Sequence, residues 1–281
     1  MSVYGKQRAA LAFCALTVPS VMLLARTNWL LATAAVIAAS ILCYFAPKRN
    51  FQKIMLAWNF VALGAATDLL CASFEQGNEL IGLLLLLLAA YAAGRNVMLR
   101  VGAVAAFFLI ILYCMLLGFS VPALKSIEPR SDGQWYLLFA ALTPMLFARE
   151  GVPKWSLGGF ALLTLLSALV TTKSGSFLHA MESVSILGIM QRLEPLASVA
   201  MTIGGFCLLG TICDVNHSLL GDAKKFSAPI NFLSGCVGIW VSRLLGAQVL
   251  AIGTAIFWGL LPFLPQSLEI QKKFEKKQKN A

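Results

Sequence analysis

The sequence predicts an all-α integral membrane protein with about ten transmembrane helices. The chain has 281 residues, of which 59% are hydrophobic and only 12% are charged. A soluble domain carries roughly twice that charged fraction. Apolar runs recur along the whole chain, and a run of about 20 apolar residues crosses a bilayer as a helix. Because these runs lack the alternation of a membrane β-barrel, helices are the structure that satisfies every backbone group in lipid.

The apolar runs divide the chain into ten expected spans joined mostly by short connections. The two longer connections cover 120–133 and 173–190. We treat residues 1–281 as a single transmembrane domain that ends in a basic tail over 265–281. The spans are expected at 9–25, 29–46, 54–73, 79–94, 97–119, 134–148, 155–172, 191–213, 229–243 and 246–264.

The positions of the basic residues predict the orientation. With ten spans and a cytoplasmic N-terminus, 16 of the 22 lysines and arginines fall on the cytoplasmic side. Cytoplasmic loops of membrane proteins are enriched in these residues. The expected protein is therefore multi-pass, with both termini in the cytoplasm. The same distribution accounts for the net charge of +10 without a nucleic-acid partner.

Ten spans allow a division into two halves of five, over about 9–119 and about 134–264. An odd number of spans in each half makes the second half enter the membrane with the opposite orientation. Such inverted repeats are found in many secondary transporters. The sequence therefore predicts a 5+5 inverted repeat of the amino-acid permease type.

Matching prolines in the first and sixth spans predict a ligand site. Pro19 lies beside Thr17 and Ser20, and Pro144 follows Thr143. A proline removes one helical hydrogen bond, and interrupted helices at corresponding positions of two halves point to a site at the bilayer midplane. We expect both helices to break there and to meet the charged ends of a small ligand. An ordinary proline kink is the alternative for each position.

Asp68 is the acidic residue inside the third span, and a charge within a span is costly. One interpretation places it in a central cavity, as the partner of an amine or as a proton site. The other places it near the outer end of the span, within reach of interfacial water.

The start and the end of the eighth span carry further polar residues. Arg192, Glu194 and Pro195 are interpreted as a structural joint, with gating as the alternative, since proline suits the first turn of a helix. Asp214, Asn216 and His217 are expected at a solvated cytoplasmic helix end. The seven cysteines are interpreted as small buried residues, because they lie in apolar runs without metal-ligand spacing. The sequence shows no motif of an enzyme or of a cofactor or metal site.

Three stretches resemble the spore germination permease family, the membrane subunits of germinant receptors. The stretch 18–30 resembles the family's first outer turn, and Tyr91-Ala92-Ala93-Gly94-Arg95 resembles its junction between the fourth and fifth spans. The most specific stretch is Met190-Gln191-Arg192-Leu193-Glu194-Pro195-Leu196, which resembles the signature at the start of the family's eighth span.

The resemblance implies a permease-like receptor subunit in the bacterial cytoplasmic or spore inner membrane. Such a subunit works with partner receptor subunits and binds a small ligand such as an amino acid. Two alternatives stay open. One is a secondary transporter that couples amino-acid or amine movement to protons, and the other is a membrane scaffold that binds no ligand.

Overall fold

The computed structural model describes residues 3–26, 29–45, 54–73, 79–120, 142, 154–171 and 194–261, and this part of the chain is helical throughout apart from the turn at 93–96 and a bend at Leu220. The expected all-α class is therefore confirmed. The elements are α1 (Val3–Arg26), α2 (Trp29–Phe45), α3 (Ile54–Ser73), α4 (Glu79–Ala92), α5 (Val97–Ser120), α6 (Lys154–Thr171), α8 (Glu194–Leu219), η3 (Gly221–Phe226), α9 (Ser227–Thr254) and η4 (Ala255–Leu260). Apart from Leu142, the sixth expected span lies outside the described residues.

Two helical stretches among the described residues are long and apolar enough to cross a membrane, Val199–Leu219 and Gly221–Leu260. Within an 18-residue apolar segment of each stretch, 67% of the residues of the first are buried, against 22% of those of the second. Most residues of that segment in the second stretch are therefore at least partly exposed. Shorter apolar helices of 10–17 residues lie within further expected spans, which stay predictions: Leu30–Cys43, Met55–Cys71, Glu79–Ala92, Val97–Leu112 and Ser156–Leu165.

Gly246 divides α9 into two arms. Its backbone has φ 72° and ψ 164°, whereas the helix continues on both sides. A residue with a side chain is disfavoured at positive φ, so glycine is the residue that permits this turn. Gly246 is the first residue of the expected tenth span (246–264), just after the expected ninth span (229–243), and the division into these two spans stays a prediction.

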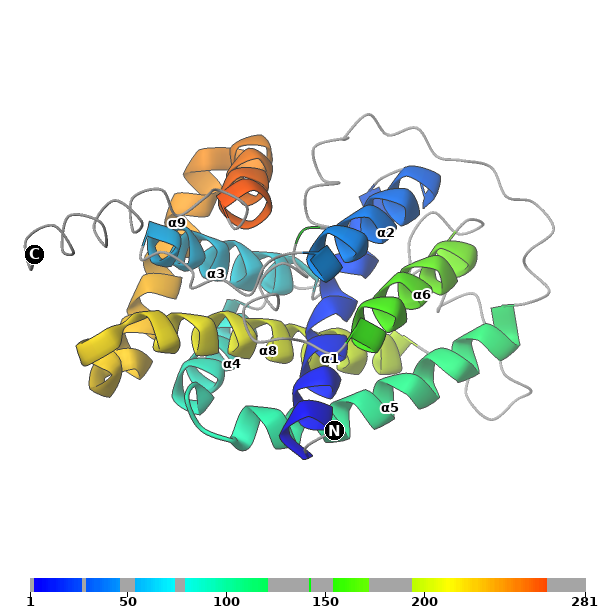
Figure 1. Ribbon diagram of the computed structural model, residues 1–281, viewed down its shortest axis with the longest axis horizontal. Coiled ribbons are helices and arrows are strands. Elements are labelled where there is room, and N and C mark those ends of the chain that lie inside the picture. Colours follow the sequence, from blue (N-terminus) through cyan, green and yellow to red (C-terminus); the bar gives the residue numbers. More distant parts are fainter. Residues whose placement is uncertain are drawn as a thin grey trace, which may run out of the picture.

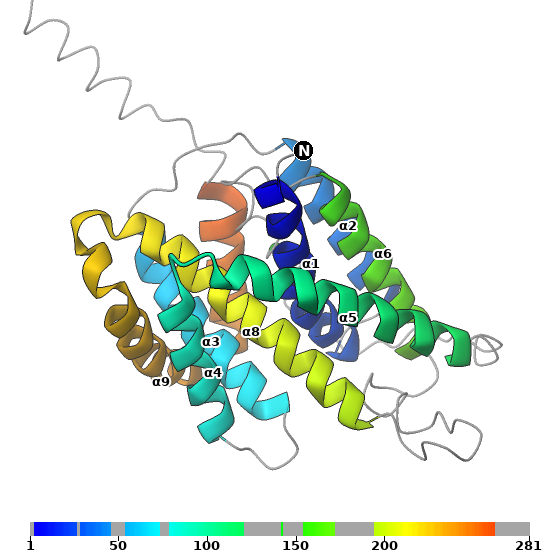
Figure 2. The same cartoon turned by 90° about the horizontal axis from the view of Figure 1, so that it is seen from below.

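Helix α8 joins two groups of helices. On one side it packs against α3 and α4, which also pack against α9, and on the other side it packs against α1 and α5. Helices α2 and α6 lie side by side, and α6 also packs against α1. Figures 1 and 2 show α8 passing between the group of α3, α4 and α9 and the group of α1, α2, α5 and α6. Its central place makes α8 the element on which both groups depend.

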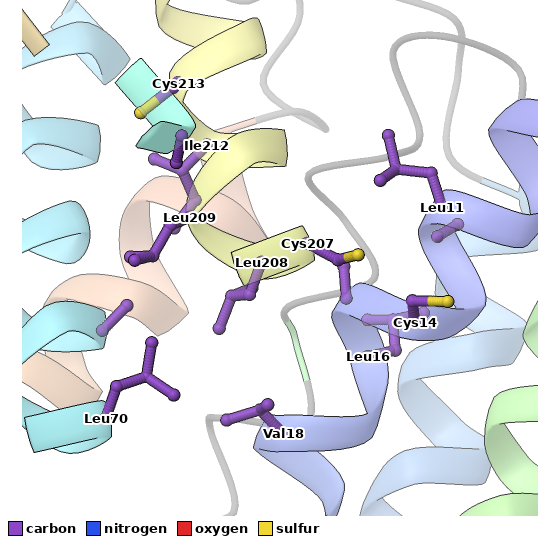
Figure 3. Close-up of a cluster of buried hydrophobic side chains, with 14 of the residues drawn as sticks. Leu11, Cys14, Leu16, Val18, Leu70, Cys207, Leu208, Leu209, Ile212 and Cys213 are labelled. Carbon is purple, nitrogen blue, oxygen red and sulfur yellow. The ribbon is translucent and has the colours of Figure 1, made fainter. Parts of the chain in front are cut away.

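The core between α1, α3 and α8 is built from small and aliphatic residues (Figure 3). Leu16 and Val18 of α1, Leu209 of α8 and Leu70 of α3 are all buried. Five of the seven cysteines are buried, as expected for small apolar residues. Gly205 of α8 leaves the space that the Leu70 side chain occupies. Glycine at such a contact therefore lets the helices approach closely, and aliphatic side chains fill the remaining space.

The closest helix crossing joins α3 to α9. A Cβ atom at Gly64 would overlap the backbone of Gly238, and one at Gly238 would lie 2.5 Å from the carbonyl oxygen of Phe60. Close backbone contacts of this kind occur in membrane proteins. Helices in lipid gain no hydrophobic driving force from association, so small residues at their interfaces allow close van der Waals packing instead. The α3–α9 contact therefore requires glycine on both helices.

The outward faces of the helices are strongly apolar. Large apolar side chains are exposed along α4, α5 and α9, and those of α9 repeat at helical spacing. They include Leu80, Leu84, Val104, Phe107, Leu233, Val237, Trp240 and Leu244. Water-soluble monomers rarely expose contiguous apolar patches of this extent.

The Gly64–Gly238 crossing predicts opposite effects of alanine at two glycines. Gly238→Ala should destabilise the protein by about 1–3 kcal/mol, because an extra carbon in a packed interface displaces backbone. Gly158→Ala on α6 should be neutral or stabilising, because no atom lies within 4 Å of the added carbon and alanine favours helix. Thermal unfolding of the detergent-solubilised variants measures both. Equal stability of the two variants would contradict the close backbone contact.

Candidate functional site

The first expected helix break is absent. Helix α1 runs without interruption from Val3 to Arg26 with Pro19 inside it. The expectation of a broken first helix is therefore wrong. Pro19 removes one backbone hydrogen bond, and α1 as a whole packs against α5, α6 and α8.

Thr17 lies in the contact between α1 and α8. Its side chain is 2% exposed, and its hydroxyl donates a hydrogen bond of 2.7 Å to the Cys14 carbonyl. A Cβ atom at Gly204 of α8 would overlap the Thr17 hydroxyl and would lie 3.0 Å from a methyl group of Val18. Glycine at 204 thus makes room for Thr17, and this stretch of α1 is closely packed.

Other expected site residues fall at the edge of the described structure. Pro19 is partly buried, and Ser20 lies in α1, although its side chain is outside the described residues. Thr143, Pro144 and Arg192 are also outside them. Contact of Thr143 and Pro144 with α1 therefore stays a prediction.

Glu194 and Pro195 begin α8. Proline in the first turn of a helix costs little, because that N–H group has no helical partner. The expected placement of Pro195 in the first turn is confirmed. The side chains of both residues are outside the described part, so the joint and gating interpretations stay predictions.

Asp68 belongs to an ionic cluster that joins three helices. Its Oδ1 atom accepts a hydrogen bond of 2.9 Å from Nε of Arg243 on α9 and lies 2.7 Å from Nη2 of the same guanidinium. Arg243 Nη2 also donates to Oε1 of Glu79 on α4, at 3.0 Å. The side chains of Arg243, Asp68 and Glu79 are 50%, 31% and 64% exposed. Asp68 is therefore partly exposed and its charge is paired, whereas its position relative to a membrane stays a prediction.

A polar junction joins the opposite ends of α4 and of the first arm of α9 to α8. The backbone N–H of Gly94, after α4, donates a hydrogen bond of 2.7 Å to Oδ1 of Asp214 on α8. His217 Nδ1 lies 2.8 Å from the hydroxyl of Ser227 at the start of α9. Gly94 has φ 70°, and a side chain there would meet the His217 ring. Both the positive φ and the adjacent imidazole therefore require glycine.

Asn216 corrects the expectation of a solvated helix end. It is fully buried, and its amide nitrogen donates a hydrogen bond of 3.1 Å to Asn231 Oδ1. Asn231 donates in turn to the Cys213 carbonyl, at 3.3 Å. The physical reason is that α9 returns along the end of α8 and covers it.

The two polar regions lie at opposite ends of single helices. Helix α4 starts at Glu79 in the ionic cluster and leads to Gly94 in the polar junction. The first arm of α9 starts at Ser227 in the junction and reaches Arg243 in the cluster. At 1.5 Å per residue, the 14 residues of α4 separate the two regions by about 21 Å. In the expected topology, spans four and nine cross the membrane in opposite directions. The start of one span and the end of the other then lie on the same side, as they do here.

Sequence reasoning missed a buried aromatic–amide cluster between α3 and η4. Trp258 Nε1 donates a hydrogen bond of 3.1 Å to Oδ1 of Asn59. The ring of Trp58 stacks on Phe257 with centroids 5.2 Å apart and planes inclined by 12°. Asn59 is fully buried, and the signal available in the sequence was an amide beside Trp58 inside an apolar run.

Two donors of this cluster have no partner. Trp58 Nε1 and Asn59 Nδ2 are buried and make no hydrogen bond within the described structure. A buried donor left unpaired costs about 1–3 kcal/mol. The aromatic–amide cluster therefore contains two donor nitrogens that make no hydrogen bond within the described structure.

No family model, no curated protein and no solved structure matches this chain.

The ionic cluster predicts coupled effects of Asp68 and Arg243. Arg243→Gln should lower the melting temperature at low salt, and the loss should shrink in about 1 M NaCl, where charges are screened within about 3 Å. Asp68→Asn should destabilise the native protein more than it destabilises the Arg243→Gln variant. A thermal double-mutant cycle measures this coupling. Strictly additive, salt-independent effects would contradict the ion pair.

Proposed function

We propose that the chain is a ten-span, inverted-repeat membrane protein of the amino-acid permease type. In this proposal it acts as the permease-like subunit of a spore germinant receptor and binds a small ligand such as an amino acid. The exposed apolar faces of α4, α5 and α9 support placement in lipid, because apolar side chains such as Leu84, Phe107 and Val237 gain nothing from exposure to water.

The observation that carries the proposal is a reciprocal pattern of helix contacts. A two-fold axis relating the halves exchanges the third span with the eighth and the fourth with the ninth. The contact between α3 and α9 then requires a contact between α8 and α4, and both are present. The axis also pairs α3 with α8, α4 with α9 and α2 with α6, and each of these pairs is in contact.

Local features support the same axis. Asp68 lies five residues before the end of α3, and Asp214 lies five residues before the end of α8. Gly94 follows α4 with φ 70°, and Gly246 ends the first arm of α9 with φ 72°. Corresponding helices thus carry an acidic residue and a left-handed glycine at corresponding places.

The proposed ligand site lies beside Pro19 and Ser20 of α1 and includes Thr143 and Pro144 of the sixth span. Thr17 bonds to its own helix and packs on Gly204, so its role is to position α1 against α8. A break in the sixth helix alone would supply free backbone groups for a carboxylate or an ammonium group.

Receptor function is favoured over proton-coupled transport by the pairing of Asp68. The transporter alternative used this carboxylate as an amine partner or proton site. In the structure the carboxylate binds Arg243 at the exposed end of α3. Binding of a ligand without movement of protons through Asp68 agrees with that arrangement.

The ligand site predicts stabilisation by one member of a panel of amino acids. A ligand that binds only the folded state at about 100 times its Kd stabilises it by about 2.7 kcal/mol. Thr143→Leu should abolish the rise in melting temperature. Thr164→Val should retain it, because the Thr164 hydroxyl donates to the Phe160 carbonyl within α6. Thermal unfolding of the detergent-solubilised protein measures all three.

Reconstitution separates the three functions. Binding without uptake of the labelled amino acid into proteoliposomes supports the receptor, and net uptake supports the transporter. Absence of stabilisation by every amino acid, in the presence of the partner subunits, would contradict the ligand site and favour the scaffold.

A further inference from the structure

We propose that the end of the molecule at the polar junction binds the headgroups of anionic phospholipids. This inference rests on the membrane placement in the proposed function, but it uses none of the residues of the proposed ligand site. The surface that binds the lipid, the basic face, consists of exposed lysines and arginines of α1, of the α4–α5 turn with the start of α5, and of η3. These residues are Lys6, Arg8, Arg95, Arg100, Lys224 and Lys225.

Contacts between helices bring the three segments of the basic face to one end of the molecule. The side-chain amide of Asn96, in the α4–α5 turn, donates a hydrogen bond of 3.3 Å to the Tyr4 hydroxyl, so the start of α1 lies beside that turn. The backbone of Gly94 in the same turn is bonded to the last two turns of α8. Because η3 follows α8 directly, its lysines lie at the same end.

Positive charge is concentrated on this face. The structure describes seven lysine and arginine side chains, and six of them belong to the basic face. The acidic side chains described at this end are Asp214, which accepts a backbone N–H, and Asp222. At the other end of the helices a single arginine faces two carboxylates. The two ends therefore differ in the sign of their net charge.

The basic side chains are available to an anion. All six are exposed, and Arg100, Lys224 and Lys225 make no ion pair within the described residues. The guanidinium of Arg95 lies over the ring of Tyr91, with its central carbon 4.9 Å from the ring centroid. A guanidinium held in this way presents parallel N–H donors that match the oxygens of a phosphate group.

The apolar surface next to the basic face favours a lipid over a water-soluble anion. Tyr4, Tyr91 and Phe226 are 54%, 60% and 65% exposed at this end, and aromatic side chains gather at membrane–water interfaces. Along α5, the exposed Val104 and Phe107 follow Arg100 by one and two turns. A phospholipid supplies a phosphate for the arginine and acyl chains for the apolar surface beyond it.

Phosphatidylglycerol and phosphatidylcholine with the same acyl chains test the headgroup charge. In the full-length protein in a non-ionic detergent at low salt, phosphatidylglycerol should raise the melting temperature at lower concentrations than phosphatidylcholine does. The joint variant Lys224→Gln with Lys225→Gln should bind phosphatidylglycerol about 25-fold more weakly, because each basic residue near an anionic lipid surface contributes about fivefold. Both side chains are exposed, so this variant should fold and respond to phosphatidylcholine as the native protein does.

The matched control is Lys276→Gln with Lys277→Gln, which removes the same charge from the basic tail and should keep the preference for phosphatidylglycerol. An equal loss of preference in both variants would overturn the proposal, because net charge alone would then explain it. Stabilisation by glycerol 3-phosphate equal to that by phosphatidylglycerol would overturn the choice of a lipid. Equal stabilisation by the two lipids would contradict the basic face and not the membrane placement, whereas no stabilisation by either lipid would contradict both.

Discussion

The arrangement of the chain depends on close backbone contact between helices at glycines. At the crossing of α3 and α9, Gly64 and Gly238 leave no room for side chains. On α8, Gly204 and Gly205 admit Thr17 from α1 and Leu70 from α3. In a lipid environment apolar side chains have little reason to leave the solvent, so such contacts hold helices together through van der Waals packing. The polar clusters then lie where these helices end.

Those polar clusters give each helix a defined orientation. Arg243 joins Asp68 to Glu79 at one end of the α3, α4 and α9 group. Asp214 and His217 join α8 to the α4–α5 turn and to α9 at the other end. Between these ends the core is apolar apart from a few amides and hydroxyls. Among them, Asn59 is fully buried and accepts a hydrogen bond from the indole of Trp258. One set of helices therefore supports an ion-paired end, a hydrogen-bonded end and a buried polar cluster between them.

The sequence predicted local features well and long-range contacts poorly. Apolar runs located the described helices, and the expected division between 229–243 and 246–264 falls where Gly246 turns the chain. The break at Pro19 was predicted wrongly, because a missing hydrogen bond is visible in the sequence but the packing of α1 is not. The pairing of Asp68 with Arg243 spans 175 positions, and that of Asn59 with Trp258 spans 199. Such pairs are decided by which helices meet, and no local pattern encodes them.

The proposed membrane-spanning arrangement places the ionic cluster and the polar junction on opposite sides of a membrane. Single cysteines at Glu79 and Asn96 test it, because both positions are exposed and they lie at the two ends of α4. The measurement is labelling with a membrane-impermeant maleimide in intact cells and again after permeabilisation, relative to the native protein. The account predicts that Glu79→Cys is labelled in intact cells and that Asn96→Cys is labelled only after permeabilisation. Labelling of both in intact cells would contradict the membrane-spanning arrangement, and the reverse order would contradict the cytoplasmic placement of the termini.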